Sequence, residues 1–259
     1  MAKRAPIRRT PKKGWCFLDT RHTLLENAAM TPAPSDGRWP RLLSLSVHEF
    51  RTPLTVVGGY IRMLLKDRAG AITDQQRKLL GEAEKSCTRL SALLVEMSDL
   101  ANLEAGTAAF NRSGVDLRAV LSDAVRSLPP LGDREIEVLL STGGGAAQVH
   151  GDPVRLKTAF ASLLTALRRE LVTSTRLFVK ERAGDLEGRP ASWIAIGDAD
   201  QIAALEQSTP STLTTFDEWR GGCGLSLAVA RRIIDAHGGA LWSPAEGTKA
   251  GAAVVLPHA

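Results

Sequence analysis

The sequence predicts two structural classes in one chain: an α-helical hairpin that forms a dimeric four-helix bundle, followed by an α/β sandwich. Three observations predict this fold. Two amphipathic helical segments, at 40–66 and 73–106, are separated by a short break around Gly70. The second segment carries an apolar heptad stripe over about four repeats. After Gly114, helical and strand patterns mix without a strict βαβ alternation, as is typical of a sandwich.

Length and composition are those of a globular protein. The 259 residues are enough for two modest domains, and 44% are hydrophobic and 24% charged. The apolar stretches are shorter than the roughly 20 residues that a transmembrane helix needs. The basic start is not followed by the apolar run of a secretory signal. We therefore expect a cytoplasmic protein without a membrane span.

Residues 1–37 read as a tail and linker. The segment is basic and then rich in Pro and Gly, and it contributes much of the formal net charge of +5. A basic tail can contact nucleic acid or anionic lipid, but a solvated terminus is the more common role. Nucleic acid is therefore disfavoured as a partner.

The segment from Thr73 to Gly106 places apolar residues three and four positions apart on one helix face. They are Leu79, Leu80, Ala83, Cys87, Leu90, Leu93, Leu94, Met97, Leu100 and Leu103. Thr73 or Asp74 is expected to begin this helix and Gly106 to end it. Two such helices bury their stripes poorly alone, so two hairpins paired in a homodimer are the simplest solution. A hairpin packed on the rest of its own chain is the alternative.

The remaining elements are shorter and follow Gly114. Helices are expected at Asp116–Leu128, Asp152–Leu171 and Gly224–His237. Strands are expected at Arg134–Ser141, Ser174–Lys180, Ser192–Ile196, Ala240–Ser243 and Ala252–Leu256. Asp152 is the expected N-cap of its helix, because Pro153 suits the first helical position. A loop is expected at 143–145, which are three glycines.

Cysteine and histidine spacing predicts no metal site and no disulfide framework. The three cysteines are widely spaced and odd in number. Four histidines have no functional context: His22, His150, His237 and His258. His150 is expected at a strand end. His237 is expected at a helix end, where the helix dipole favours a cation.

The most informative segment is Ser46–Thr55, with the sequence SVHEFRTPLT, inside the first predicted helix. His48 would face solvent there, and a neutral imidazole is a good nucleophile near neutral pH. Glu49 is a carboxylate beside it that can hold the proton of the other ring nitrogen. Thr52 lies one turn further along the same helix face. The segment therefore predicts a nucleophilic histidine with two supporting polar groups.

Over these ten positions the chain resembles the H-box of the commonest histidine kinase family. The resemblance implies that His48 accepts phosphate, that Glu49 serves kinase activity and that Thr52 serves phosphatase activity. It also implies that residues 38–106 form a dimerisation and histidine phosphotransfer hairpin with a response regulator as partner. Pro53 cannot donate a backbone hydrogen bond, which predicts a loosened helix that lets His48 move between partners.

Residues 114–259 resemble the ATPase domain that follows this hairpin in histidine kinases. Residues 221–239 are similar to the family's second glycine box and the helix after it. Glycines let the backbone approach a phosphate, and a helix N-terminus favours negative charge. The resemblance implies ATP with Mg²⁺ as cofactor. It assigns four residues to nucleotide binding, namely Asp198, Gly222, Gly224 and Leu225.

The segment 152–171 resembles the family's N-box helix but lacks its two asparagines. The second of these holds Mg²⁺ in the family, and this chain has Ser162 and Ala166 at the two positions. Alanine offers no ligand atom to a hard cation that needs oxygen ligands. Thr165 and Glu170 are nearby residues with side-chain oxygens.

The two glycine boxes also depart from the family pattern. The first box keeps Asp198 but has lost both expected glycines, and Asp200 brings a negative charge near the nucleotide. In the second box, Ser226 stands where the family usually has glycine. Phe216 and Trp219 resemble the two aromatic positions just before it, and they leave room for only a very short lid.

Together these features predict a two-component histidine kinase that autophosphorylates His48 with ATP and passes the phosphate to an aspartate of a response regulator. The alternative is a degenerate kinase that acts as a non-catalytic phosphotransfer, phosphatase or docking module. The alanine at 166 motivates this alternative. Residues 1–37 are too short for an ordinary sensor fold, so a separate sensor protein is expected to supply the signal.

Overall fold

The structure is a computed structural model that describes residues 38–132, 134–143, 147–245 and 251–259. The predicted tail and linker at 1–37 lies outside the described residues, as do residues 144 and 145 of the predicted glycine loop. Within the described ranges, no helix combines the length and the apolar character that crossing a bilayer requires.

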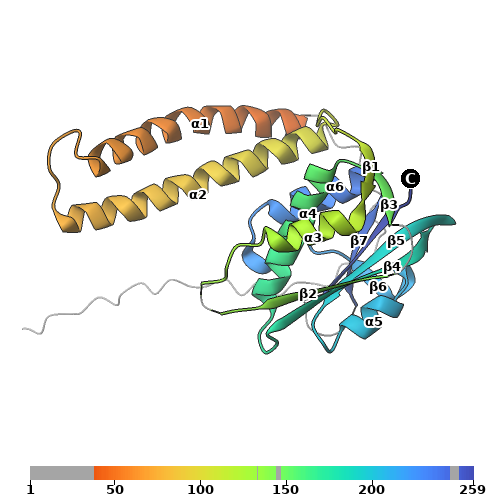
Figure 1. Ribbon diagram of the computed structural model, residues 1–259. Helices are drawn as coiled ribbons and strands as arrows, with labels where there is room; N and C mark the ends of the chain where they lie inside the picture. Colours follow the sequence, from red (N-terminus) through yellow and green to blue (C-terminus); the bar gives the residue numbers. More distant parts are fainter. Residues whose placement is uncertain (1–37, 133, 144–146, 246–250) are drawn as a thin grey trace, which may run out of the picture. The chain divides into compact units, whose positions relative to one another are not determined.

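Two long helices form the hairpin (Figure 1). Helix α1 spans Arg38–Leu65 and helix α2 spans Asp74–Glu104. In the turn between them, Asp67 and Gly70 have positive φ angles of 54° and 114°. Arg77 of α2 stabilises the turn by donating hydrogen bonds to both carboxylate oxygens of Asp67 at 2.8 Å. The predicted helices and the break between them are confirmed.

Helix α2 begins with a complete capping box. The Thr73 side chain accepts a hydrogen bond from the Gln76 backbone N–H at 3.2 Å, and the Gln76 side chain accepts one from the Thr73 N–H at 2.8 Å. Two backbone donors that the first helical turn leaves without partners are thereby satisfied. The prediction that Thr73 or Asp74 begins this helix is confirmed, with Thr73 as the N-cap and Asp74 as the first helical residue.

Replacing Thr73 with alanine is expected to lower the free energy of unfolding by about 1 kcal/mol, because one capping interaction is lost. Urea denaturation followed by circular dichroism measures the change. Thr88→Ala is the matched control, since the Thr88 hydroxyl donates to the Glu84 carbonyl of its own helix and caps no helix end. That variant is expected to be neutral or slightly stabilising. An equal loss in both variants would contradict a capping role.

The second part of the chain is an α/β sandwich built on a six-stranded sheet (Figure 1). The strand order across the sheet is β2 (Glu137–Thr142), β4 (Arg176–Leu186), β5 (Arg189–Gly197), β8 (Ala252–Pro257), β7 (Ala240–Pro244) and β6 (Leu213–Thr215). Only β2 and β4 pair in parallel among these described strands. A separate two-stranded sheet pairs β1 (Ser113–Asp116) with β3 (Gln148–Gly151).

Helices cover both faces of the large sheet. Helices α3 (Leu117–Arg126), α4 (Pro153–Glu170) and α6 (Ser226–Ala236) share the main apolar core with one sheet face. The short helix α5 (Ile202–Gln207) packs on the opposite face with Trp193 and its neighbours. Alternate side chains of one strand point to opposite faces, so β5 and β8 supply residues to both cores. The predicted α/β sandwich is confirmed.

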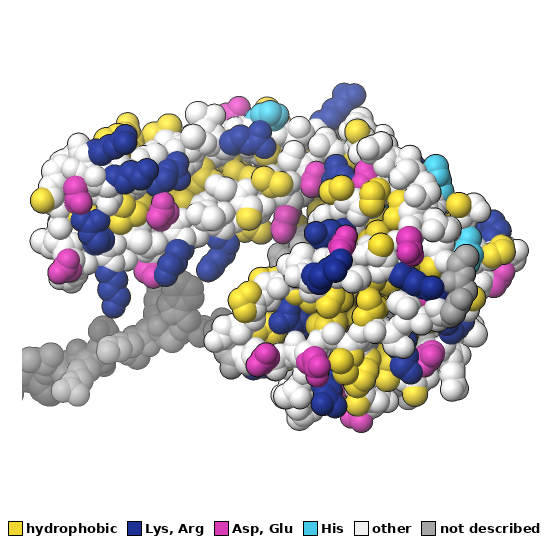
Figure 2. All heavy atoms as spheres, in the orientation of Figure 1, with side chains coloured by type: hydrophobic (Ala, Val, Ile, Leu, Met, Phe, Trp, Pro, Cys, Tyr) yellow, Lys and Arg dark blue, Asp and Glu magenta, His cyan; other side chains and the backbone are white. Residues whose placement is uncertain are grey.

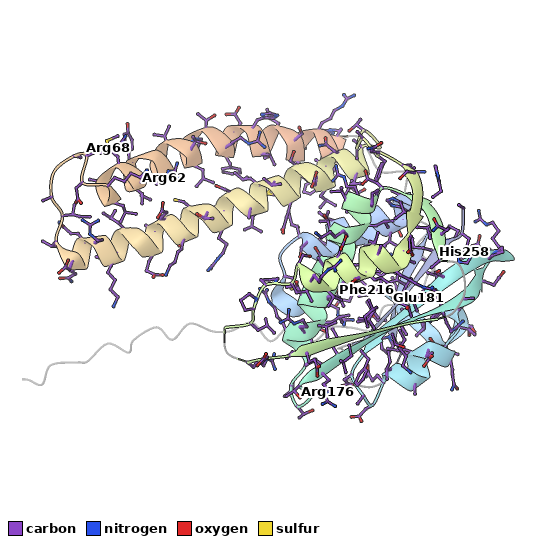
Figure 3. The ribbon with its side chains drawn as sticks, in the orientation of Figure 1. Arg62, Arg68, Arg176, Glu181, Phe216 and His258 are labelled. Atoms are coloured by element: carbon purple, nitrogen blue, oxygen red, sulfur yellow. The ribbon has the colours of Figure 1, made fainter. Side chains whose placement is uncertain are left out.

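Strand β4 runs further than predicted, through a charged stretch. The Glu181 side chain is buried, and its Oε2 accepts from the Arg118 Nε of α3 at 3.3 Å (Figure 3). Its Oε1 accepts from the Ser192 hydroxyl of β5 at 3.3 Å. Because a neighbouring strand and a helix satisfy this carboxylate, a charged residue is tolerated in the middle of a sheet.

The predicted positive charge at His237 is corrected by the structure. The His237 side chain is buried and its Nε2 accepts a hydrogen bond from the Asp152 N–H at 2.9 Å, so that nitrogen carries no proton. The Nδ1 atom lies 2.7 Å from the Ile233 carbonyl and donates to it. Burial lowers the pKa of His237, and the nearby Arg112 charge adds to this. The neutral form fits this site better than the cation.

This burial predicts a stability that depends on pH. As pH falls below about 6.5, the unfolded chain protonates His237 before the folded chain does, so unfolding becomes easier. The contribution is fully present above the unfolded pKa and is lost as pH falls toward the lowered folded pKa. His237→Gln keeps an acceptor for the Asp152 N–H and removes the titration. Urea unfolding at about pH 7.5 and about pH 5.5 is expected to show a smaller loss in the variant, and an equal loss would contradict the assignment.

Candidate functional site

The candidate phosphoacceptor, His48, lies on an exposed face of α1. Its neighbour Val47 is 1% exposed, faces α2 and anchors this part of the helix. His48, Glu49 and Thr52 are all exposed on the same helix. Since residues four apart lie one turn apart, the His48 ring and the Thr52 hydroxyl share one face. The three residues that the sequence singled out therefore lie exposed within about one turn of α1, with Glu49 next to His48 in the chain.

Helix α1 continues through Pro53 without interruption to Leu65. Pro53 has no N–H, so it cannot supply the donor that the Glu49 carbonyl would otherwise receive. A helix with this missing bond is easier to bend at the turn that carries His48. The predicted movement of His48 between partners stays a prediction.

An apolar groove runs between α1 and α2 beside this turn, and we call it the hairpin groove. It is about 510 Å³ in volume. Its lining consists of Phe50, Pro53, Leu54, Val57, Cys87, Leu90, Leu93, Leu94 and Met97. The large apolar side chains of Phe50 and Leu90 are more than half exposed to solvent. Figure 2 shows hydrophobic side chains at the surface along the hairpin, between basic ones.

The position that holds Mg²⁺ in the family offers no ligand atom in this sandwich. Ala166 of α4 is 1% exposed and its methyl group belongs to the main core. Thr165 donates its hydroxyl to the Ala161 carbonyl one turn earlier in the same helix. Ser162 lines a cavity of about 520 Å³ together with Arg169 and Ser226. Among the described residues, no group of three or more His, Cys, Asp or Glu side chains is placed to hold a metal ion.

Glu170, the other oxygen-bearing candidate, is paired with an arginine. It is the last residue of α4, and its carboxylate accepts from Arg220 Nε at 2.9 Å and from Arg220 Nη2 at 2.8 Å. The two side chains are 12% and 5% exposed. This two-pronged geometry is the strongest form of an arginine–carboxylate pair. Sequence reasoning missed this pair, because the two residues are 50 positions apart.

The glycine segment before α6 adopts the backbone that its glycines allow. Gly222 and Gly224 have positive φ angles of 59° and 64°, and Leu225 is the N-cap residue of α6. The Leu225 N–H donates to the carboxylate of Glu96 on α2. Burial raises the pKa of Glu96, and this hydrogen bond opposes the rise. The Glu96 carboxylate thus accepts the hydrogen bond of a backbone N–H, that of Leu225, which the resemblance assigns to nucleotide binding.

Asp198, which the resemblance assigns to nucleotide binding, is buried and accepts hydrogen bonds from the backbone of its own turn. Its Oδ1 atom accepts from the Asp200 N–H at 3.2 Å and from the Gln201 N–H at 3.1 Å. These bonds hold the turn that leads into α5. The first glycine box of this chain therefore acts as the turn before a helix.

These observations test whether ATP with Mg²⁺ fits the residues present. The position of the metal-binding asparagine holds a core methyl group, and the neighbouring carboxylate of Glu170 already binds a cation of the chain. A second carboxylate, Glu96, lies against the glycine segment and repels phosphate. The described residues therefore do not fit a magnesium-bound nucleotide.

Comparison with known proteins places these features in a family. Residues 41–106 match the model of the His Kinase A (phospho-acceptor) domain. The circadian input-output histidine kinase CikA of Synechococcus elongatus is 28% identical over 227 residues, which cover 86% of this chain and 30% of that protein. The sensor protein GacS of Pseudomonas syringae pv. syringae is 26% identical over 226 residues, which cover 82% of this chain and 24% of that protein.

A solved structure extends the comparison to the fold. Full-length ShkA, crystallised in complex with AMPPNP, superposes with a TM-score of 0.60 at 22% identity, covering 85% of this chain and 46% of that chain. The chain spans about a quarter to a third of the length of CikA and GacS. The domain match and the sequence relatives support a two-component sensor histidine kinase core, and the ShkA structure shares its fold.

Proposed function

We propose that this chain is a histidine-phosphorylation core in which His48 accepts a phosphoryl group and passes it to an aspartate of a response regulator. The observation that carries the proposal is the exposed position of His48 on α1, inside the segment that matches the phospho-acceptor domain. Glu49 and Thr52 lie beside it and are equally open to a partner. The response regulator docks on this face and presents its receiver aspartate to the imidazole.

The chemistry of the step needs one nucleophile and one base. The lone pair of one His48 ring nitrogen attacks phosphorus, and the bond from phosphorus to the oxygen of the donor breaks. The electron pair of that bond leaves with the donor oxygen, and the proton on the other ring nitrogen passes to Glu49. Transfer to the receiver aspartate reverses these roles, because a carboxylate oxygen then attacks phosphorus and the ring nitrogen leaves. Thr52 orients a water molecule when the phosphorylated receiver is hydrolysed.

A homodimer completes the proposed assembly. The hairpin groove leaves half-exposed apolar side chains on both helices, and a second hairpin would cover them. Burial of apolar surface on this scale is the main driving force of helix-bundle association. A separate sensor protein as the source of the signal and a cytoplasmic location remain predictions of the sequence.

Two sources of the phosphate on His48 are to be distinguished. The relatives are named histidine kinases, which favours autophosphorylation from ATP. The buried methyl of Ala166 and the pairing of Glu170 with Arg220 favour the second form, a phosphotransfer, phosphatase or docking module that uses phosphate from elsewhere. Both forms use the same histidine.

One labelling experiment with two donors tests the proposal. The purified chain is incubated either with radiolabelled ATP and Mg²⁺ or with phosphoramidate, a small donor that phosphorylates imidazole directly. Label on the peptide containing His48 that is acid-labile and base-stable supports the proposal, and the donor that works identifies the form. A receiver domain phosphorylated with acetyl phosphate serves as a third donor. Failure of all three donors to label His48 would overturn the proposal.

A further inference from the structure

Arg220 is held from every side by groups of its own chain. Besides the two bonds to Glu170, its Nη1 donates to the Ser243 hydroxyl at 3.0 Å and its Nη2 to the Gly251 carbonyl at 3.2 Å. Its guanidinium carbon lies 5.0 Å from the centre of the Phe216 ring, which Figure 3 labels inside the sandwich. Each guanidinium nitrogen thus has a hydrogen-bond partner in the fold.

This pair links the parts of the sandwich that the family resemblance assigns to a nucleotide. Glu170 ends α4, the helix that carries Ala166, and Arg220 begins the short turn Arg220–Gly222 that leads into the glycine segment. Ser243 belongs to β7, and Gly251 directly precedes β8. One guanidinium therefore joins the end of α4, the glycine segment, β7 and the residue before β8.

We propose that the Arg220–Glu170 pair replaces the magnesium-bound nucleotide, so that the sandwich folds around an internal ion pair and takes up no magnesium nucleotide. The pair has no net charge, and both carboxylate oxygens of Glu170 are engaged. Entry of a magnesium ion would break a buried, doubly hydrogen-bonded contact before the metal gained a ligand. The inference rests on the proposed function, in the form in which His48 receives its phosphate from a donor other than ATP bound to this chain.

Thermal unfolding of the full chain with and without Mg²⁺ and millimolar ATP tests this proposal. A site filled at one hundred times its dissociation constant raises the midpoint by several degrees. We expect a shift below about 1 °C, and the ShkA kinase, whose crystal structure contains AMPPNP, is the positive control. A saturable rise that requires both ATP and Mg²⁺ would overturn the proposal.

Phosphoramidate labelling of His48 in the same samples separates this inference from the proposed function. An unchanged unfolding midpoint together with labelled His48 supports both this inference and the proposed function. A rise of the unfolding midpoint with Mg²⁺ and ATP, together with labelled His48, overturns only the proposal that the ion pair replaces the nucleotide. No shift, together with no label on His48 from any of the three donors, overturns the proposed function and leaves the ion pair in place of the nucleotide.

Discussion

Replacing His48 with glutamine is expected to lower labelling of the residue-48 peptide by at least about 1,000-fold, down to the background of the assay. A glutamine amide nitrogen is not a nucleophile at neutral pH, because its lone pair is delocalised onto the carbonyl. The His48 side chain is exposed, and glutamine is a good helix former, so the fold is retained. Mass spectrometry of the phosphorylated peptide, with unchanged circular dichroism, measures the loss.

Variants of the neighbouring residues separate loss of the nucleophile from loss of its helpers. Glu49→Gln is expected to slow labelling by about 100-fold while leaving His48 as the labelled residue, because only the base is removed. Thr52→Ala is expected to leave labelling unchanged and to slow dephosphorylation of a phosphorylated receiver. His150→Gln, which changes an exposed histidine of the sandwich, is the neutral control. Undiminished label in the His48→Gln chain would contradict the assignment.

Replacing Arg220 with methionine is expected to lower the free energy of unfolding by about 3–5 kcal/mol. The substitution leaves the Glu170 carboxylate buried without its guanidinium, and it also removes the donors to Ser243 and Gly251. Methionine fills much of the same volume, so the loss reflects the unpaired charge more than a cavity. Urea denaturation of the full chain measures the difference.

Two further variants decide whether the pairing itself matters. The double variant Arg220→Met with Glu170→Leu removes both charges and is expected to recover much of the loss, because a buried pair is often replaceable by apolar groups. Arg176→Met, at a residue that Figure 3 labels, is the matched control. The side chains of its pair with Glu137 are 63% and 58% exposed, so the pair is worth at most about 1 kcal/mol. A loss from Arg220→Met no larger than that from Arg176→Met would contradict the buried ion pair.

Local signals made much of the fold predictable from sequence. Thr73 begins α2 and Asp152 begins α4 as expected, because a capping residue and the turn after it lie within four positions of each other. The heptad stripe of α2 is equally local, since each apolar position relates to the next turn. The H-box was readable for the same reason: its functional residues occupy one short helical segment.

Long-range pairing explains what the sequence did not disclose. His150 was expected at a strand end and lies in β3, but the pairing of β1 with β3, the short strand β6 and the helix α5 were missed, because each is stabilised by residues distant in the chain. In the nucleotide region, the sequence indicated which family residues are gone. It did not indicate that Arg220 and Glu170 meet, because their contact requires the fold to bring α4 against the glycine segment. The neutral state of His237 likewise depends on burial, which no local pattern reports.

The position of β8 in the sheet sets the order in which the sandwich is completed during synthesis. Strand β8 follows all other strands in the sequence, yet it lies between β5 and β7 at the centre. Without β8, β5 and β7 would each present an open hydrogen-bonding edge. Open edges attract other strands and promote aggregation. We therefore expect the sandwich to be most prone to aggregation while β8 is still missing from the sheet.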